Sequence, residues 1–360
     1  MRSRWFTPVL TLLLAGLLLV QCSGDDGGPT GPAPSPRTYR MGFSGIPPRQ
    51  DLALTIQTID LWSARADAAL MLSEPPWEAL LAGIPPDSIV RATQLGLANY
   101  YRSKGLRIVA SVDPTNGLNR SADSQPLVDA GRSLTEPAVQ QLYRSYVTAL
   151  DTIVHPDFLG VASETNLIRA IAPSALYTAV VQVGNGAAGD VRAVDPDVQL
   201  FTTVQVETAW GRLVPGSGFI GVDQDRADFP FIQVLGLSSY PYLGGFSDPD
   251  SIPIDYYTTI DATSPIPMMV IEGGWPSDSS GVAGTPEKQV RYITRHAAIL
   301  DRAQAIGWFQ ITFTDLDVDS FPVPPGTSLG PFAHLGLVDE HLVPKPSLVQ
   351  WDTEFRRTRR

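Results

Sequence analysis

Two stretches, Phe158-Leu-Gly-Val-Ala-Ser-Glu-Thr-Asn166 and Met268-Met-Val-Ile-Glu-Gly-Gly-Trp275, decide how this chain folds. Each is a short apolar run that ends on a glutamate, Glu164 in the first and Glu272 in the second. An uninterrupted apolar run of this kind predicts a strand that is covered on both faces, as in a parallel sheet. Both glutamates therefore fall where a buried strand gives way to a loop. The alternative for either one is an ordinary exposed acid, because acidic side chains mostly lie in solvent.

Similar runs recur along the chain and alternate with helical patterns. The eight strand candidates are 39–43, 68–72, 107–112, 158–162, 199–205, 234–238, 268–271 and 308–312. Apolar residues occur at helical spacing in the intervening segments 87–104, 136–153 and 285–304. The last of these opens on Thr285 followed by a proline, the signature of an N-cap and first helical position. Eight such alternations predict a single α/β domain, a (β/α)8 TIM barrel.

The main alternative is a doubly wound open sheet, which usually has fewer strands and carries a glycine-rich phosphate loop after its first strand. Here the first strand leads into Gly42-Phe-Ser-Gly-Ile-Pro-Pro48, whose prolines do not suit phosphate binding. The chain has no GxxxxGK[ST] loop, no paired CxxC and no HExxH, and its four histidines lack ligand spacing. We therefore expect no cofactor and no metal site. The net charge of −11 also argues against a nucleic-acid partner.

The N-terminus predicts a lipoprotein signal. Residues 1–21 place two arginines before an apolar core that is too short to span a bilayer comfortably. Leu19-Val20-Gln21-Cys22 then resembles a bacterial lipobox, although Gln21 replaces the usual small residue, and implies that Cys22 is lipidated. A stray cysteine after a secretory signal is the alternative. Residues 22–36 read as a flexible Gly/Pro/Ser/Asp linker, and 37–360 as the barrel. We expect an exported protein whose membrane contact, facing the periplasm or the cell surface, is this anchor alone.

In a parallel α/β barrel, the residues that follow the strands face the active site. Apart from the two glutamates, the candidate site residues at these positions are Glu74, Trp77, Asp113, Asn116, Ser163, Asn166, Glu207, Tyr240, Tyr242, Trp275 and Gln310. Flat aromatic faces stack on sugar C–H surfaces, and carboxylates and amides bind hydroxyl groups. This rim therefore predicts a sugar-binding cleft, with a polysaccharide or oligosaccharide as partner.

Several of these residues also have plain structural interpretations. Trp77 and Trp275 could pack over the barrel mouth, and Glu74 could cap a helix. Asp113 could cap its own turn through a side-chain bond to the backbone. The two glutamates on different strand ends point to glycosidic-bond cleavage, in which one carboxyl group protonates the leaving oxygen and the other attacks or directs a water molecule.

Four segments, taken in order, resemble a known family. Val234-Leu-Gly-Leu-Ser-Ser-Tyr-Pro-Tyr242 resembles the sixth-strand motif of endo-β-1,4-galactanases, glycoside hydrolase family 53, and of related clan A barrels. The segments 158–166 and 270–276 are similar to their fourth-strand and seventh-strand segments, and 334–347 is similar to their closing segment. The resemblance implies a retaining, galactanase-like hydrolase of β-linked substrates. It makes Glu164 the acid/base, Glu272 the nucleophile, and Tyr240 the hydrogen-bond donor that holds the nucleophile.

One position departs from the family pattern. The family has asparagine immediately before the acid/base, where it bonds the sugar 2-hydroxyl, and this chain has Ser163. A catalytically degenerate barrel that serves as a surface glycan-binding lipoprotein is therefore the alternative function. If the chain is an enzyme, we expect the shared proton of the pair on Glu164 and the negative charge on Glu272.

Overall fold

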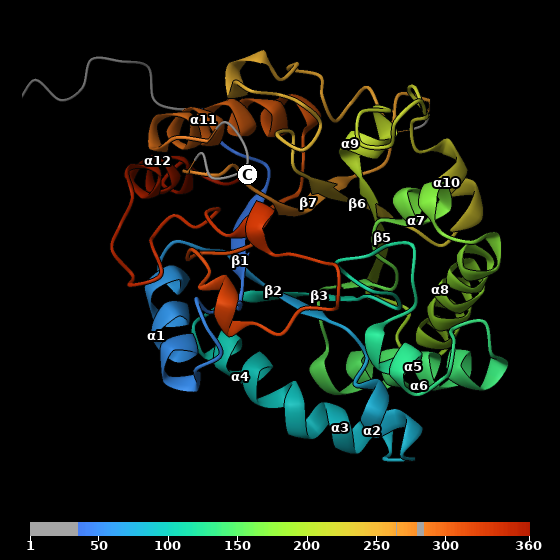
Figure 1. Ribbon diagram of the computed structural model, residues 1–360. Coiled ribbons are helices and arrows are strands. Elements are labelled where there is room, and N and C mark those ends of the chain that lie inside the picture. The colour runs from blue at the N-terminus through green and yellow to red at the C-terminus, as the bar shows by residue number, and fades with distance from the viewer. Residues whose placement is uncertain (1–34, 264, 279–283) are drawn as a thin grey trace, which may run out of the picture. The chain divides into compact units, whose positions relative to one another are not determined.

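The structure, a computed structural model, describes residues 35–263, 265–278 and 284–360. Eight parallel strands close a barrel in chain order (Figure 1). They are β1 (Arg40–Ser44), β2 (Ala68–Ser73), β3 (Arg107–Val112), β4 (Phe158–Gly160), β5 (Gln199–Gln205), β6 (Val234–Ser239), β7 (Met268–Gly273) and β8 (Gly307–Gln310). The barrel closes where β8 pairs with β1, from Arg40 opposite Gly307 to Phe43 opposite Gln310. The predicted (β/α)8 barrel is confirmed. The signal, Cys22 and most of the linker lie outside the described residues.

The longer helices surround the barrel in Figure 1. They are α1 (Leu52–Ser63), α3 (Pro86–Thr93), α4 (Leu95–Ser103), α6 (Pro137–Val154), α8 (Ser174–Val194), α11 (Pro286–Ala303) and α12 (Pro346–Phe355). The segment expected as one helix over 87–104 is broken at Gln94, between α3 and α4. The predicted N-cap of α11 is confirmed, because the hydroxyl of Thr285 accepts a hydrogen bond from the N–H of Lys288 at 3.2 Å.

Short helices follow several strands and build the rim of the barrel mouth. They are α2 (Trp77–Leu81), α5 (Gln125–Asp129), α7 (Thr165–Ile171), α9 (Val206–Ala209) and α10 (Asp223–Asp228), with 3-10 turns at Pro249–Ser251, Val318–Ser320 and Gly330–Phe332. Within the described part of the chain, no helix combines the length and the apolar content needed to cross a bilayer.

Two buried layers hold the fold together. Inside the barrel, aliphatic and aromatic side chains form a compact cluster of Ala68, Leu70, Val109, Phe201, Val234, Met269, Ile271 and Phe309. A larger cluster fills the space between the strands and the helices. The inner layer has room for the ring of Phe201 because two neighbouring strand residues are glycines. A Cβ on Gly160 would lie 2.5 Å from this ring, and one on Gly236 would lie 3.0 Å from it.

A β-bulge interrupts β7 just before its glutamate. Leu237 of β6 lies opposite Val270, but the next residue, Ser238, lies opposite Glu272. Ile271 is therefore an extra residue in the ladder, and it packs in the inner cluster. Alternation along a strand would send the residue after an inward-facing one to the outer face. The bulge re-aims Glu272 toward the inside of the barrel mouth, as bulges beside functional sites commonly do.

Candidate active site

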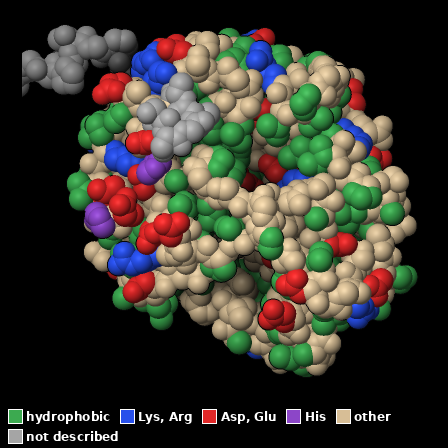
Figure 2. All heavy atoms as spheres, in the orientation of Figure 1, with side chains coloured by type: hydrophobic (Ala, Val, Ile, Leu, Met, Phe, Trp, Pro, Cys, Tyr) green, Lys and Arg blue, Asp and Glu red, His purple; other side chains and the backbone are tan. Residues whose placement is uncertain are grey.

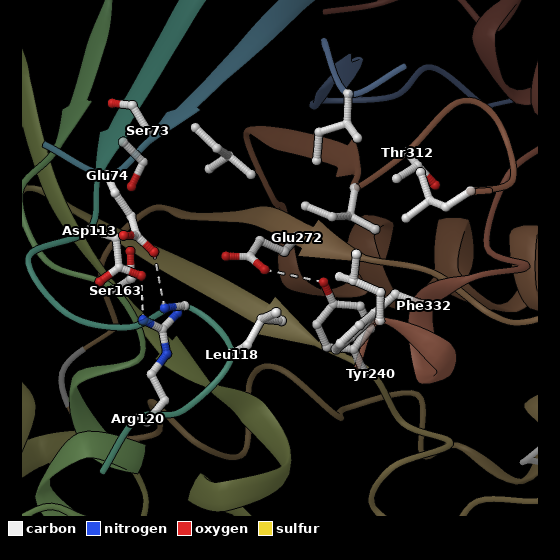
Figure 3. Close-up of a pocket in the computed structure, with 17 residues that line it drawn as sticks. Ser73, Glu74, Asp113, Leu118, Arg120, Ser163, Tyr240, Glu272, Thr312 and Phe332 are labelled. Carbon is white, nitrogen blue, oxygen red and sulfur yellow. Dashed lines mark hydrogen bonds and ion pairs between the residues drawn. The ribbon is translucent and has the colours of Figure 1, made fainter. Parts of the chain in front are cut away.

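Glu272 lies at the C-terminal end of β7 and faces Tyr240, which follows β6 (Figure 3). The Tyr240 hydroxyl donates a hydrogen bond to Oε2 of Glu272 at 3.1 Å, as the resemblance implied. Burial raises the pKa of Glu272 above its usual range, and the negative charge of Glu164 raises it further. The nearby Arg120 cation and the hydrogen bond from Tyr240 act in the opposite direction.

Glu164 follows β4 and is the N-cap residue of α7, with a left-handed backbone at φ 46° and ψ 47°. Its N–H donates to the hydroxyl of Thr203 at 2.8 Å, which anchors the residue to β5. Its carboxylate is bonded on both oxygens. Ser238 donates to Oε1 at 2.6 Å, and Nε of Arg120 donates to Oε2 at 2.8 Å. With 8% of its surface exposed, this carboxylate is held in one orientation.

Arg120 is the central functional residue that the sequence analysis missed. It lies in the loop between β3 and α5, and its guanidinium forms ion pairs with both Asp113 and Glu164. Its side chain is 6% exposed, so both ion pairs are largely shielded from water. The one available signal was that it is the single cation in the loop 113–124 that follows a strand-end aspartate. Nothing in that spacing shows that the loop folds back over the barrel mouth.

Two adjoining cavities open at the barrel mouth, and each contains one of the two glutamates. The Glu272 cavity has a volume of about 290 Å³, and the Glu164 cavity about 340 Å³. Both are lined by Gly117, Leu118, Arg120, Tyr240 and Phe332, which form the wall between them. Acidic and basic side chains lie within the central hollow of the surface in Figure 2. The two sequence-predicted glutamates are thus brought to one mouth, on either side of a shared wall.

The two carboxyl groups lie in different surroundings. Glu164 accepts hydrogen bonds from the guanidinium of Arg120 and the hydroxyl of Ser238. Glu272 is buried, which raises its pKa, and accepts a hydrogen bond from Tyr240. The expectation that the shared proton of the pair lies on Glu164 stays a prediction.

Four of the predicted substrate-contacting residues line the Glu272 cavity: Glu74, Asp113, Ser163 and Tyr240. Glu74 also ties the loop down, since it accepts hydrogen bonds from the Ser124 hydroxyl at 2.8 Å and the Gly117 N–H at 3.3 Å. Burial raises the pKa of Glu74. The remaining lining, which the sequence analysis did not identify, is largely apolar and includes Ile46, Leu72, Leu118, Ile311, Leu316, Leu329 and Phe332.

The three predicted amides lie outside both cavities and bond the backbone instead. Asn166 binds Gln205 twice, accepting from its N–H at 2.8 Å and donating to its C=O at 2.9 Å. The side-chain oxygen of Asn116 accepts from the N–H groups of Leu118 and Asn119, at 3.0 Å each. Gln310 donates to the carbonyl of Leu335 at 3.0 Å. These amides shape the rim and present no group to a ligand in this structure.

The predicted aromatic platforms are also packed away. Trp77 is 1% exposed and stacks on Tyr143 at a centroid distance of 6.3 Å. Trp275 is 1% exposed and meets Tyr242 edge to face at 6.0 Å. None of the three predicted aromatic residues Trp77, Trp275 and Tyr242 lines either cavity. An aromatic residue at a strand end can pack in the core or line the cleft, and these three side chains pack in the core.

Glu207 is fully buried beneath the site. It accepts hydrogen bonds from the Tyr240 N–H and the Tyr256 hydroxyl, both at 3.0 Å. Burial raises its pKa to about 7. Its role in this structure is to hold the backbone of Tyr240, and through it the hydroxyl that contacts Glu272. Within the described residues, no cluster of three or more His, Cys, Asp or Glu side chains is arranged to hold a metal ion.

Comparisons with known proteins find likeness in structure alone. The chain matches no protein-family model and no curated protein. Its fold is similar to that of an exo-β-1,4-mannosidase from Opitutaceae bacterium strain TAV5, with a TM-score of 0.66 and 16% identity. That match covers 89% of this chain and 59% of the mannosidase, so this chain spans less than two thirds of the length of that protein.

Two further solved structures cover more of their own length. A GH5_18 protein from Streptomyces cattleya, in complex with Manβ1-4GlcNAc, has a TM-score of 0.62 and 16% identity, covering 89% of this chain and 81% of that one. The GH53 catalytic domain of Ignisphaera aggregans has a TM-score of 0.59 and 16% identity, covering 90% and 92%. At such identities the likeness establishes a shared fold. The expected resemblance to clan A glycoside hydrolase barrels is confirmed at that level.

Proposed function

We propose that this chain is a retaining glycoside hydrolase that cleaves β-linked glycosides, oligosaccharides among them, by double displacement. The observation that carries the proposal is the pair Glu164 and Glu272, which lie after β4 and at the end of β7 at one barrel mouth, where Arg120 holds Glu164 and Tyr240 holds Glu272. Paired carboxyl groups flanking one space are the equipment for glycosidic-bond cleavage. The shared fold of glycoside hydrolases supports the same function.

In the first step, the Glu272 carboxylate attacks the anomeric carbon while Glu164 gives a proton to the leaving oxygen. In the second, water attacks the glycosyl-enzyme and Glu164, now the base, takes its proton. The first step therefore needs the proton on Glu164 and the negative charge on Glu272.

Glu164 must exchange its contact with Arg120 for the glycosidic oxygen before it can donate a proton. Positive charge that develops at the anomeric carbon in the transition state is stabilised by an ionised Glu272 beside it.

Galactan is the first polysaccharide to test, because the segments around Tyr240 and Glu272 resemble those of galactanases. We also propose that the protein is exported and anchored through Cys22. The second candidate function, a glycan-binding barrel without catalysis, is favoured by two observations. Ser163 replaces the asparagine of the family pattern, and Arg120 occupies an oxygen of the proposed acid.

A reducing-sugar assay over β-linked polysaccharides and oligosaccharides separates the two functions. Galactan, mannan, xylan and β-glucans should be tested with the wild type, with Glu272→Gln, and with Glu78→Gln as a matched control. Glu78 is an exposed acid on α2 and lines neither cavity. We expect turnover that Glu272→Gln abolishes and Glu78→Gln preserves. Binding of a glycan in affinity electrophoresis, with no turnover of any glycoside, would establish the binding function instead.

A further inference from the structure

The Glu164 cavity is walled mainly by aliphatic and aromatic carbon. Seven apolar residues line it: Leu118 of the wall shared with the Glu272 cavity, Leu167 and Ile171 of α7, Leu213 and Leu243 of the loops after β5 and β6, and Pro331 and Phe332 of the last 3-10 turn. Figure 2 shows hydrophobic side chains around the central hollow. Burial of a ligand against such a wall is favourable only for apolar ligand surface.

Several of the polar side chains that line this cavity are already engaged within the protein. Gln205 donates to Glu207 and accepts from the N–H of Thr208. The side-chain oxygen of Asn119 accepts from Ser121 twice, at 3.2 and 2.6 Å. Ser328 accepts from the N–H of Gly330 at 3.0 Å. A sugar ring placed here would bring several hydroxyl groups to a wall with few free partners, and each buried unpaired hydroxyl is unfavourable.

None of the described tryptophans offers a stacking platform for a sugar in the same place. Five of the described tryptophans are fully buried in the core: Trp62, Trp77, Trp275, Trp308 and Trp351. The sixth, Trp210, stacks on Tyr256 at a centroid distance of 5.3 Å. No described tryptophan lines either cavity.

In a double displacement, the two cavities would bind different parts of the substrate, the sugar and the leaving group. The nucleophile contacts the anomeric carbon of the sugar that becomes covalently attached, and the acid contacts the leaving oxygen. The sugar therefore belongs on the side of Glu272, whose cavity is also lined largely by apolar residues but includes the carboxylates Glu74 and Asp113 as hydroxyl acceptors. The leaving group belongs on the side of Glu164.

We propose that the preferred substrates are β-glycosides with an apolar leaving group, aryl or alkyl, which occupies the Glu164 cavity. This inference rests on the proposed function for its assignment of the two sides, since Glu164 must be the acid. It narrows that function from β-linked glycosides in general to those whose aglycone is hydrophobic. The sugar of such a substrate is a single ring, because the Glu272 cavity of about 290 Å³ lies at the small end of ligand pockets.

Binding of non-hydrolysable thioglycosides tests the inference without requiring turnover. Methyl and hexyl 1-thio-β-glycosides of glucose, galactose and mannose should be compared by calorimetry, together with one S-linked disaccharide of each sugar. Each buried methylene strengthens binding about fourfold. We therefore expect one hexyl thioglycoside to bind at least about tenfold more tightly than its methyl partner, and more tightly than the disaccharide, since two methylenes already suffice.

Variants locate the bound alkyl chain. Leu167→Gln and Leu243→Gln should remove most of the hexyl advantage. Leu97→Gln, a change at a partly exposed leucine of α4 outside both cavities, should keep it. The inference is overturned if no hexyl glycoside binds measurably, if the disaccharide binds as tightly, or if both cavity variants keep the full advantage. A protein that binds hexyl glycosides in this way but turns over no glycoside would disprove the proposed function and leave the apolar site standing.

Discussion

Nε of Arg120 lies 2.8 Å from Oε2 of Glu164, so the proposed acid of this barrel forms a buried ion pair before substrate arrives. The same guanidinium also pairs with Asp113. To donate a proton to a leaving oxygen, the Glu164 carboxyl group has to release this contact. Whether this contact can be released therefore distinguishes an active hydrolase from a barrel that only binds glycans.

Removing the Arg120 charge should move the acidic limb of the pH profile to higher pH. The cation lowers the pKa of Glu272, so Arg120→Gln raises that pKa and delays ionisation of the nucleophile. We expect the acidic limb of kcat/KM to move up by roughly one unit. Arg120→Lys keeps the charge and should largely keep the profile. A lower rate with unmoved limbs would show that Arg120 serves only to hold the loop.

Tyr240→Phe should shift the acidic limb alone. The hydroxyl hydrogen bond favours the charged form of Glu272, so its loss raises the pKa of the nucleophile and delays ionisation to higher pH. A hydrogen bond to a charged group is worth about 1.5–3 kcal/mol, so kcat at neutral pH should fall roughly 10- to 100-fold. Tyr242→Phe is the control, because that hydroxyl donates to the carbonyl of Pro331. An equal shift in both variants would contradict the assignment.

Glu164→Gln should slow cleavage most for substrates whose leaving group needs a proton. General acid catalysis contributes roughly 10²–10⁴-fold, so glycosides with alcohol leaving groups should lose about that factor in the first step. Activated aryl glycosides leave without protonation and should keep most of that step, seen as a burst of released phenol. If both kinds of substrate lose the burst equally, Glu164 is not the general acid.

Asn166→Ala should lower stability and leave substrate binding alone. It strips the partners from the N–H and C=O of Gln205, both in a fully buried region. Each unsatisfied group costs about 1–3 kcal/mol, so urea unfolding should show a loss of roughly 2–5 kcal/mol. The control Asn99→Ala, at an exposed position on α4, should change stability by no more than about 0.5 kcal/mol. A raised KM with unchanged stability would return Asn166 to the list of substrate contacts.

Cys22→Ser should release the protein from the membrane. The proposed anchor is the lipid on this cysteine, and the Gly/Pro-rich sequence that follows it, residues 23–36, carries no further apolar run. Fractionation of cells should find the wild type with the membranes and the variant in the soluble fraction. Membrane association that survives the substitution would rule out the lipid anchor.

The strands were predictable because their signal is local. A strand covered on both faces is apolar along its whole length, as in the runs that end at Glu164 and Glu272. Whether an aromatic side chain at a strand end packs in the core or lines the cleft was not predictable. Trp77 and Trp275 are equally suited to a cleft and to a core, and only packing against Tyr143 and Tyr242 decides between them.

Two features of the site arise from contacts that no short sequence segment contains. Arg120 reaches Glu164 because its loop is tied to Glu74, 43 positions away from Gly117 along the chain. Glu272 faces the mouth because Ile271 is an extra residue in the ladder, and this depends on the register with β6. The acids at the strand ends could therefore be named from the sequence, whereas the contact between Arg120 and Glu164 could not.

The left-handed backbone of Glu164 indicates that glutamate is kept at this position for its chemistry. Such a conformation costs a non-glycine residue roughly 1–3 kcal/mol, and glycine or asparagine adopts it more easily. A barrel that no longer catalyses a reaction would gain stability if glycine or asparagine replaced glutamate at this site. Among relatives of this chain, glutamate at this position should therefore accompany turnover, and glycine or asparagine should mark lineages in which the barrel has become a binding module.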